Sequence, residues 1–221
     1  MSMFEIIGKY HVAFASGLMV TVKLAVTVWI SGLVTGSLLG IVGATHKKTF
    51  GRLIALGSFL LSGLPLLVLL FWLHYPMQVM LGVVIDPFIT ACIALGVANA
   101  FGVAEAVRNA LADFPAQYAM AAKVAGLTGR ETLLHIKAPI LLRQLLPTFL
   151  TLQVGMLQAT LFASLISVEE LFKVAQRINS MIYKPIEIYS ALGIFFLLVC
   201  LPLNGLALWL KAKYTRNLSE S

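Results

Sequence analysis

Five uncharged polar side chains lie within stretches of this sequence that are otherwise apolar, where each could hydrogen-bond a polar solute. Polar groups are costly inside a bilayer, so they usually pack within a helix bundle or line a cavity. Spacings of seven and four residues place three of them, Gln153, Thr160 and Ser164, on one face of a helix. The five candidate residues of a solute pathway are Asn99, Gln153, Gln158, Thr160 and Ser164.

Direct contact with a solute is not expected of all five, because Ser and Thr in membrane spans often hydrogen-bond only neighbouring helices. Gln158 and Thr160 are the strongest candidates. The sequence contains no Walker A, GxSxG or HExxH pattern, so no catalytic residue is predicted. His74 and His135 are far apart in the chain, and no cluster of His, Asp or Cys is visible. We therefore expect no metal site and no membrane enzyme or redox anchor.

The elements that hold these residues must be membrane helices. Only 11% of the residues are charged and 60% are hydrophobic, with a mean hydropathy of +0.94, whereas soluble domains carry about 25% charged residues. A helix needs about 20 apolar residues to cross a hydrocarbon core of about 30 Å. Charge-free windows predict an all-α integral membrane protein with a single domain, residues 1–221. Its five expected spans are 14–45, 53–82, 87–107, 140–168 and 187–210.

The second charge-free window is too long for one untilted span. Gly63, Pro65 and Pro76 within it indicate a kinked helix, or a helix followed by a short surface segment. Pro87 is expected to open the third span at its first turn, where the missing N–H costs little.

Basic residues are distributed unevenly between the two sides of these spans. The loop after the first span, the long loop after the third span and the C-terminal tail share one side and hold most of them. The positive-inside rule therefore predicts a cytoplasmic C-terminus and an external N-terminus. The same rule accounts for the net charge of +7. The expected partner of the basic residues is therefore a lipid bilayer, and no binding of nucleic acid is expected. The basic residues on the cytoplasmic side are Lys47, Lys48, Arg52, Arg108, Lys123, Arg130, Lys137, Arg143, Lys211, Lys213 and Arg216.

The polar region between the third and fourth spans, residues 108–139, is expected to form a cytoplasmic loop of two short helices. Residues 116–125 are rich in helix formers, and Gly126 is placed to end that helix in a left-handed conformation. The small side chains of Ala121 and Ala122 would let a partner surface approach the backbone closely. An amphipathic helix resting on the membrane has the same pattern, so both interpretations stay open.

The second short helix begins with a capping-box pattern, in which Thr128 is the N-cap and Glu131 the third helical residue. Pro139 is expected to end it. On the other side of the loop, Glu105 and Arg108 are three residues apart at the end of the third span and could form an ion pair. Such a pair contributes only about 0.2–0.5 kcal/mol when it is exposed.

Several residues of this region fit one pattern when they are taken together: Glu105, Arg108, Pro115, Ala121, Ala122 and Gly126, followed by Pro139 and Pro147. That pattern resembles the EAA loop of ABC-importer permeases, in particular those for polar amino acids. Segments 17–25, 62–75 and 163–180 are similar to other parts of such permeases. The sequence departs from the family at Met120, where a glutamate is usual. It also departs at Gln158 and Ala159, where the family often has Lys-Asp.

The resemblance implies a permease subunit of an ATP-driven, binding-protein-dependent importer for polar or charged amino acids, in a bacterial inner membrane. Such permeases pair with a second permease, identical or not, and with an external substrate-binding protein. A dimer of ATP-binding subunits holds ATP and Mg²⁺, so this chain would hold no cofactor and be no enzyme. Residues 116–126 would form the helix that couples to the ATPase. The implied coupling residues are Ala121, Ala122, Gly126, Glu105 and Arg108.

Two other functions remain as alternatives. The first is an ABC permease for another small solute, which the identity of the partner binding protein would reveal. The second is a secondary transporter driven by an ion gradient, which would predict internal repeats and ionisable residues in the middle of spans. The charge-free windows argue against the second alternative.

Overall fold

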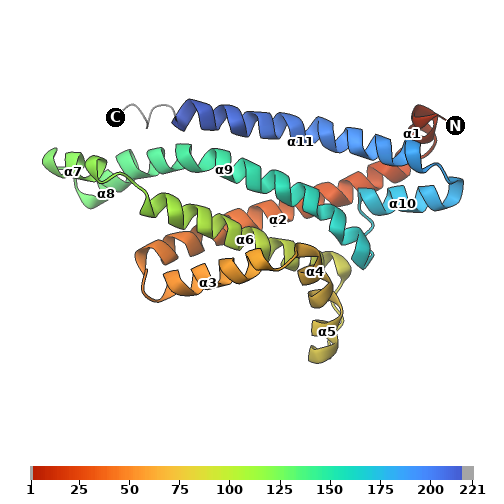
Figure 1. Cartoon of the computed structure of the whole chain (residues 1–221), viewed down its shortest axis with the longest axis horizontal. Helices are drawn as coiled ribbons and strands as arrows, with labels where there is room; N and C mark the ends of the chain where they lie inside the picture. The colour runs from red at the N-terminus through yellow and green to blue at the C-terminus, as the bar shows by residue number, and fades with distance from the viewer. Residues whose placement is uncertain (1, 216–221) are drawn as a thin grey trace.

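The computed structural model describes residues 2–215, and within that range it contains helices and no strand. Most of the long helices run roughly along one common direction (Figure 1). Arg216, which belongs to the basic tail, lies outside the described residues. In chain order the elements are α1 (Met3–Lys9), α2 (His11–Thr45), α3 (Phe50–Gly63), α4 (Leu66–His74), α5 (Pro76–Leu81), α6 (Pro87–Ala112), α7 (Ala116–Val124), α8 (Gly129–Thr132), the π-helical turn η1 (Leu133–Lys137), α9 (Ala138–Ala159), the 3-10 helix η2 (Thr160–Ile166), α10 (Leu171–Ile182) and α11 (Pro185–Thr215).

Four helical stretches are long and apolar enough to cross a membrane: α2, α6, the run from α8 to η2, and α11. A fifth span is formed if α3 and the α4–α5 segment are counted together, and these two bend by 97° at the break between them. The break falls at Gly63–Pro65, so the expected interruption of the second span is present. The prediction of an all-α membrane protein is confirmed.

Several helix ends differ from the expected ones. The third span continues to Ala112, and the helix that contains the fourth span begins at Gly129. We expected Pro139 to end a short helix, but the helix runs through it into α9. A proline ring in a regular α-helix clashes with the carbonyl four residues earlier. The wider π-helical turn at residues 133–137 precedes Pro139 and lets the helix accommodate the ring.

The most extensive helix packing lies between α2 and α6, and it depends on glycine. A Cβ atom on Gly36 would lie 2.5 Å from the carbonyl oxygen of Ala100, and one on Gly40 would lie 2.6 Å from Cβ of Val107. Either contact would force the two helices apart. Small residues at the interface are a common way for membrane helices to approach closely.

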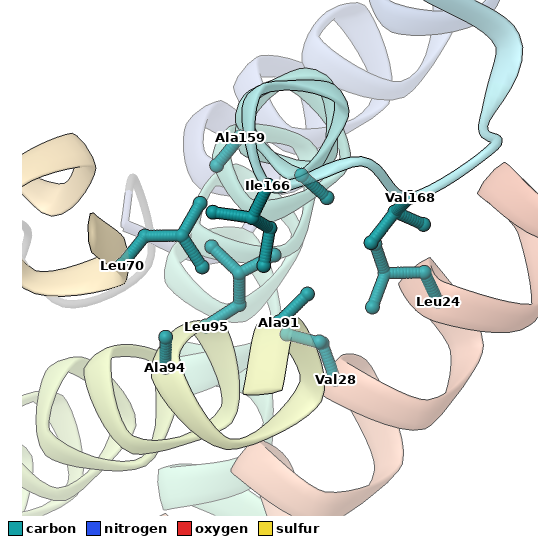
Figure 2. Close-up of a cluster of buried hydrophobic side chains, with 10 residues drawn as sticks. Leu24, Val28, Leu70, Ala91, Ala94, Leu95, Ala159, Ile166 and Val168 are labelled. Atoms are coloured by element: carbon teal, nitrogen blue, oxygen red, sulfur yellow. The ribbon is translucent and has the colours of Figure 1, made fainter. Parts of the chain in front are cut away.

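One buried apolar cluster ties the bent segment to the long helices. Leu70 of α4 packs with side chains of α2, α6 and the end of the fourth span (Figure 2). This cluster fixes α4 at the level where α9 changes into η2. The labelled members are Leu24, Val28, Leu70, Ala91, Ala94, Leu95, Ala159, Ile166 and Val168.

Candidate transport and coupling sites

Two of the five predicted polar residues form a reciprocal pair of hydrogen bonds between helices. The Asn99 amide nitrogen donates to Oε1 of Gln153 at 2.9 Å, and the Gln153 amide nitrogen donates to Oδ1 of Asn99 at 3.2 Å. Asn99 also donates to the Val28 carbonyl at 3.0 Å, and the Trp29 indole donates to the Gln153 carbonyl at 2.9 Å. Both amides are buried. The network joins α2, α6 and α9, and its polar atoms are occupied within the chain.

Thr160 and Ser164 are also buried, and their hydroxyls bond to the backbone of the preceding turn. Oγ1 of Thr160 donates to the Leu157 carbonyl at 2.6 Å, and Oγ of Ser164 donates to the Leu161 carbonyl at 2.7 Å. Thr160 is 0% exposed. In this conformation both hydroxyls therefore donate their hydrogen bonds to backbone carbonyls of their own helical segment.

Gln158 has a different environment, because it is exposed and lines a cavity of about 580 Å³. The cavity lies among the end of the fourth span, α10 and α11. Phe172 and Tyr189, whose ring centroids are 6.0 Å apart, line it together with Phe196. An amide beside aromatic rings can hydrogen-bond a polar group while the rings contact its apolar part.

The hairpin formed by α7 and α8 has the local geometry that the sequence predicts. Gly126 has a φ of +73°, and the N–H of Leu127 donates to the Ala122 carbonyl at 3.0 Å, which closes the end of α7. The hydroxyl of Thr128 accepts from the Glu131 N–H at 3.3 Å, while the Glu131 carboxylate accepts from the Thr128 N–H at 2.8 Å. These caps set the shape of the hairpin, which lies at one end of the helix bundle (Figure 1).

The two alanines of α7 do not face the same way. Ala122 is buried against the rest of the chain, whereas Ala121 is exposed. The outer surface of α7 also presents Met120 and Val124, which are 66% and 91% exposed. Within this helix, the surface that a partner could contact therefore combines these apolar side chains with the exposed Gln117 and Lys123, and it includes only the first of the two alanines.

Glu105 and Arg108 form the predicted ion pair at the end of α6. Nε of Arg108 donates to Oε2 of Glu105 at 3.1 Å, and Asn109 donates to Oε1 of the same carboxylate at 3.2 Å. Glu105 also lines a cavity of about 550 Å³ between α3 and α6. Arg108 lines a second cavity that includes Lys47 and Arg52.

The comparisons with known proteins place this arrangement in a family. Residues 32–216, which are most of the chain, match the family described as "Binding-protein-dependent transport system inner membrane component". The chain belongs to this family. The sequence-based resemblance to importer permeases is thereby confirmed.

Curated relatives of this inner membrane component are permease proteins of named transport systems. HisQ of Salmonella typhimurium (strain LT2), from a histidine/lysine/arginine/ornithine transport system, is 29% identical over 213 residues, covering 90% of this chain and 92% of the relative. GlnP of Escherichia coli (strain K12), from a glutamine transport system, is 28% identical over 186 residues, covering 80% of this chain and 84% of the relative.

Solved structures share the fold of this inner membrane component. An amino acid ABC transporter with histidines aligns with a TM-score of 0.83 at 23% identity, covering 94% of this chain and 96% of that chain. The MetNI methionine ABC transporter, in an inward-facing conformation, aligns with a TM-score of 0.69 at 17% identity, covering 91% of this chain and 98% of that chain.

The structure of this inner membrane component also contains a buried carboxyl group that sequence reasoning missed. Glu169 pairs with Arg177 at 2.8 Å, as its neighbourhood suggests, but Glu170 is 0% exposed. The Glu170 carboxyl accepts from the N–H groups of Phe172 and Lys173 at 2.9 and 2.8 Å and so caps α10. Burial raises the pKa of Glu170 to about 7. The only sequence signal for this buried carboxyl was a glutamate at the N-cap of α10, where Ser, Thr, Asp and Asn are the usual residues.

A second missed group holds the connection between α5 and α6. Gln78 is buried and donates to Oγ1 of Thr90 at 3.1 Å, while its oxygen accepts from the Ile85 N–H at 2.8 Å. His74 stacks edge-on against Tyr75, with ring centroids 4.7 Å apart. These contacts fix the connection between α5 and α6 although α5 itself projects from the bundle (Figure 1).

Proposed function

We propose that this chain is the permease subunit of an ATP-driven importer for polar or charged amino acids. The observation that carries the proposal is the likeness to permeases named for histidine, lysine, arginine, ornithine and glutamine transport, which extends over most of the chain. ATP and Mg²⁺ would be held by separate ATP-binding subunits. A second permease, identical or not, and an external substrate-binding protein would complete the transporter.

In this proposal the α7–α8 hairpin contacts an ATP-binding subunit on the cytoplasmic side. Exposed apolar side chains on α7 supply a contact surface, and Gly126 sets the turn that presents them. Ala122 anchors α7 to its own chain, and the ion pair of Glu105 with Arg108 braces the end of α6. The N-terminus would then lie outside and the C-terminus in the cytoplasm, as the distribution of basic residues favours.

The proposed solute contact is Gln158, because this residue is exposed and lines a cavity with an aromatic wall. Tyr189 lines the same cavity. Asn99 and Gln153 would act indirectly, by holding α9, the helix that carries Gln158, against α2 and α6. Thr160 and Ser164 would contribute only after a conformational change that releases their hydroxyls.

The first experiment is purification of the tagged chain from native membranes in mild detergent, with mass spectrometry of the proteins that accompany it. We expect a P-loop ATPase, and a second permease would establish a heterodimer. Repeated recovery of the intact chain alone would favour a secondary transporter. Uptake assays with the purified complex in vesicles then test histidine and glutamine, and a requirement for ATP separates the two classes.

Substitution of Gln158 tests the solute contact. Gln158→Met keeps the length of the side chain and removes its hydrogen bonds, so we expect KM for amino-acid uptake to rise roughly tenfold, for a lost bond of about 1.4 kcal/mol. Gln176→Met makes the same chemical change on α10, away from the residues that line the cavity, and is the control. An unchanged KM in Gln158→Met, or an equal rise in the control, would remove Gln158 from the pathway.

A further inference from the structure

A groove lined by two basic side chains lies between α9 and α11, near the end of the bundle that carries α7. Its volume is about 530 Å³, and α9 supplies Arg143 while α11 supplies Lys211. Both side chains are exposed. No carboxylate lines the groove, and within residues 2–215 neither cation forms an ion pair. Two positive charges therefore face one space without a counter-charge from the described part of the chain.

The rest of the groove combines polar donors with an apolar wall. Gln144, Thr148 and Tyr214 can donate hydrogen bonds into it. Pro147 and Leu208 form part of its apolar surface. An inorganic anion would satisfy the cations and donors but leave the apolar wall uncovered. A ligand that matches both parts carries an anionic group next to a hydrocarbon chain.

The position of the groove along α11 fits the boundary between lipid headgroups and hydrocarbon. Trp209 is exposed one residue away from the groove-lining Leu208, and the ammonium of Lys213 lies 4.7 Å from the centroid of its ring. Tryptophan and lysine gather at this depth in membrane proteins. Toward the middle of the span, α11 presents exposed leucines such as Leu201 and Leu198, against which acyl chains would lie.

We propose that the groove between α9 and α11 binds the phosphate headgroup of an anionic phospholipid, with Arg143 and Lys211 as the two cations. Basic pockets between membrane helices are suited to such headgroups. The donors of Gln144, Thr148 and Tyr214 would bond the phosphate or glycerol oxygens. This site is separate from the proposed solute cavity at Gln158 and does not depend on the importer function.

The test is native mass spectrometry of the transporter, purified with its accompanying subunits and titrated with phosphatidylglycerol or phosphatidylcholine. We expect tighter binding of phosphatidylglycerol and a loss of roughly 25-fold in the Arg143→Gln/Lys211→Gln variant, since each cation near a membrane surface contributes about fivefold. Lys47→Gln/Lys48→Gln removes the same charge at two exposed positions outside the groove and is expected to bind like the native chain. Lys211→Gln alone, at an exposed position, keeps the test valid if the double variant is unstable.

Each other result would overturn the proposal. Equal affinity for phosphatidylcholine would show that the anionic charge is not recognised. Equal weakening in the control variant would show a general surface effect. Competition by inorganic phosphate or glycerol phosphate as strong as that by phosphatidylglycerol would identify a soluble anion, and not a lipid, as the ligand.

Discussion

The amide pair of Asn99 and Gln153 stabilises the bundle only as long as both partners are present. Each amide supplies a donor and an acceptor to the other in a buried region, where unpaired polar groups are rare. Removing one partner leaves the other without a hydrogen-bond partner and costs about 1–3 kcal/mol of folding stability. Replacing both with apolar groups of similar shape can leave the stability nearly unchanged. Single and double substitutions must therefore have different consequences.

We predict that Asn99→Leu lowers the thermal unfolding midpoint of the purified protein, because the Gln153 amide loses its partner. The expected loss of stability is about 1–3 kcal/mol. In the Asn99→Leu/Gln153→Met variant most of that loss is expected to be recovered. Melting curves in one detergent measure both effects, and a double variant less stable than the single one would contradict the predicted coupling.

The raised pKa of the buried Glu170 carboxyl leads us to predict that the stability of the protein depends on pH. Its folded-state pKa of about 7 lies above the ordinary value of 4.5, so the folded protein binds the proton more tightly than the unfolded chain. The resulting stabilisation is fully present below about pH 4.5 and is lost as the pH rises through about 7, by roughly 3 kcal/mol in all. The unfolding midpoint is thus expected to fall between pH 5 and pH 8.

The matched variants for this effect are Glu170→Gln and Glu169→Gln. The amide introduced by Glu170→Gln stays neutral at every pH in this range, so this variant is expected to flatten the pH dependence. Glu169 is exposed and pairs with Arg177, and its substitution is expected to leave the slope in place. A slope that survives in Glu170→Gln would assign it to another group.

At this scale the sequence predicts which side chains are polar within apolar runs, but not how they pair. Asn99 and Gln153 lie on different helices, and the hydrogen-bonding register between helices depends on packing that local spacing does not encode. Glu170 was missed because Lys173 and Arg177 follow it at helical spacings, which favour a solvated ion pair. Its burial arises from the docking of α10 on α2, where the Leu171 N–H donates to Oγ1 of Thr21 at 3.0 Å.

Among the elements, the α7–α8 hairpin is the one whose local sequence most directly specifies its shape. A left-handed residue with φ near +73° follows α7, and glycine reaches that conformation at little cost. The capping box at Thr128 begins the next helix within two residues. The orientation of α7 relative to α8 is therefore set by a few backbone angles.

We predict that Gly126→Pro abolishes coupling while leaving the protein inserted in the membrane. Proline fixes φ near −65°, far from the observed value, and removes the N–H that donates to the Lys123 carbonyl at 3.1 Å. ATP-driven uptake in vesicles is expected to fall at least tenfold, as it is for Ala122→Glu, which would place a carboxylate at a buried position.

Gly129→Ala is the control in the same hairpin, since an added Cβ there meets no atom within 4 Å and φ is not positive. Its uptake is expected to be near that of the native chain. Normal uptake in both Gly126→Pro and Ala122→Glu would exclude this hairpin as the coupling element.

Helix caps were predictable from the sequence because they depend on neighbouring residues, as Gly126 and Thr128 illustrate. The continuation through Pro139 was not, because proline signals a helix end unless the turn before it is widened. A π-helical turn has no clear sequence signature, so its presence at residues 133–137 emerges only in the structure. The 97° bend after α3 was signalled by Gly63 and Pro65, but its size was not.

The whole molecule is unevenly packed, which fits a subunit of a larger assembly. The most apolar stretch of α6 is 50% buried within the chain, whereas that of α11 is only 11% buried. On α5 and the turn that follows, Val79 and Met80 are 81% and 78% exposed, and Val84 is 100% exposed. Lipid or neighbouring subunits must cover these surfaces. The sequence predicts the spans through their lack of charge, but not which faces remain open.

Orientation in the membrane can be tested with single cysteines in a background without Cys92 and Cys200. Thr49→Cys, between α2 and α3, is expected to react with a membrane-impermeant maleimide only after permeabilisation. Met181→Cys, at the end of α10, is expected to react in intact spheroplasts. Both positions are exposed, so reactivity reports the side of the membrane, and the reversed pattern would refute an external N-terminus.

The helical run from Gly129 to Ile166 has a mechanical consequence. Its 38 residues, at about 1.5 Å per residue, form a rod roughly 57 Å long. One end of the rod is α8, which forms the hairpin with α7. The other end, beyond Gln158, joins the apolar cluster at Ile166. A rod of that length that tilts by about 5° around its middle displaces each end by roughly 2.5 Å, in opposite directions. The widened turn before Pro139 thus preserves a lever arm that a helix break would have cut in two.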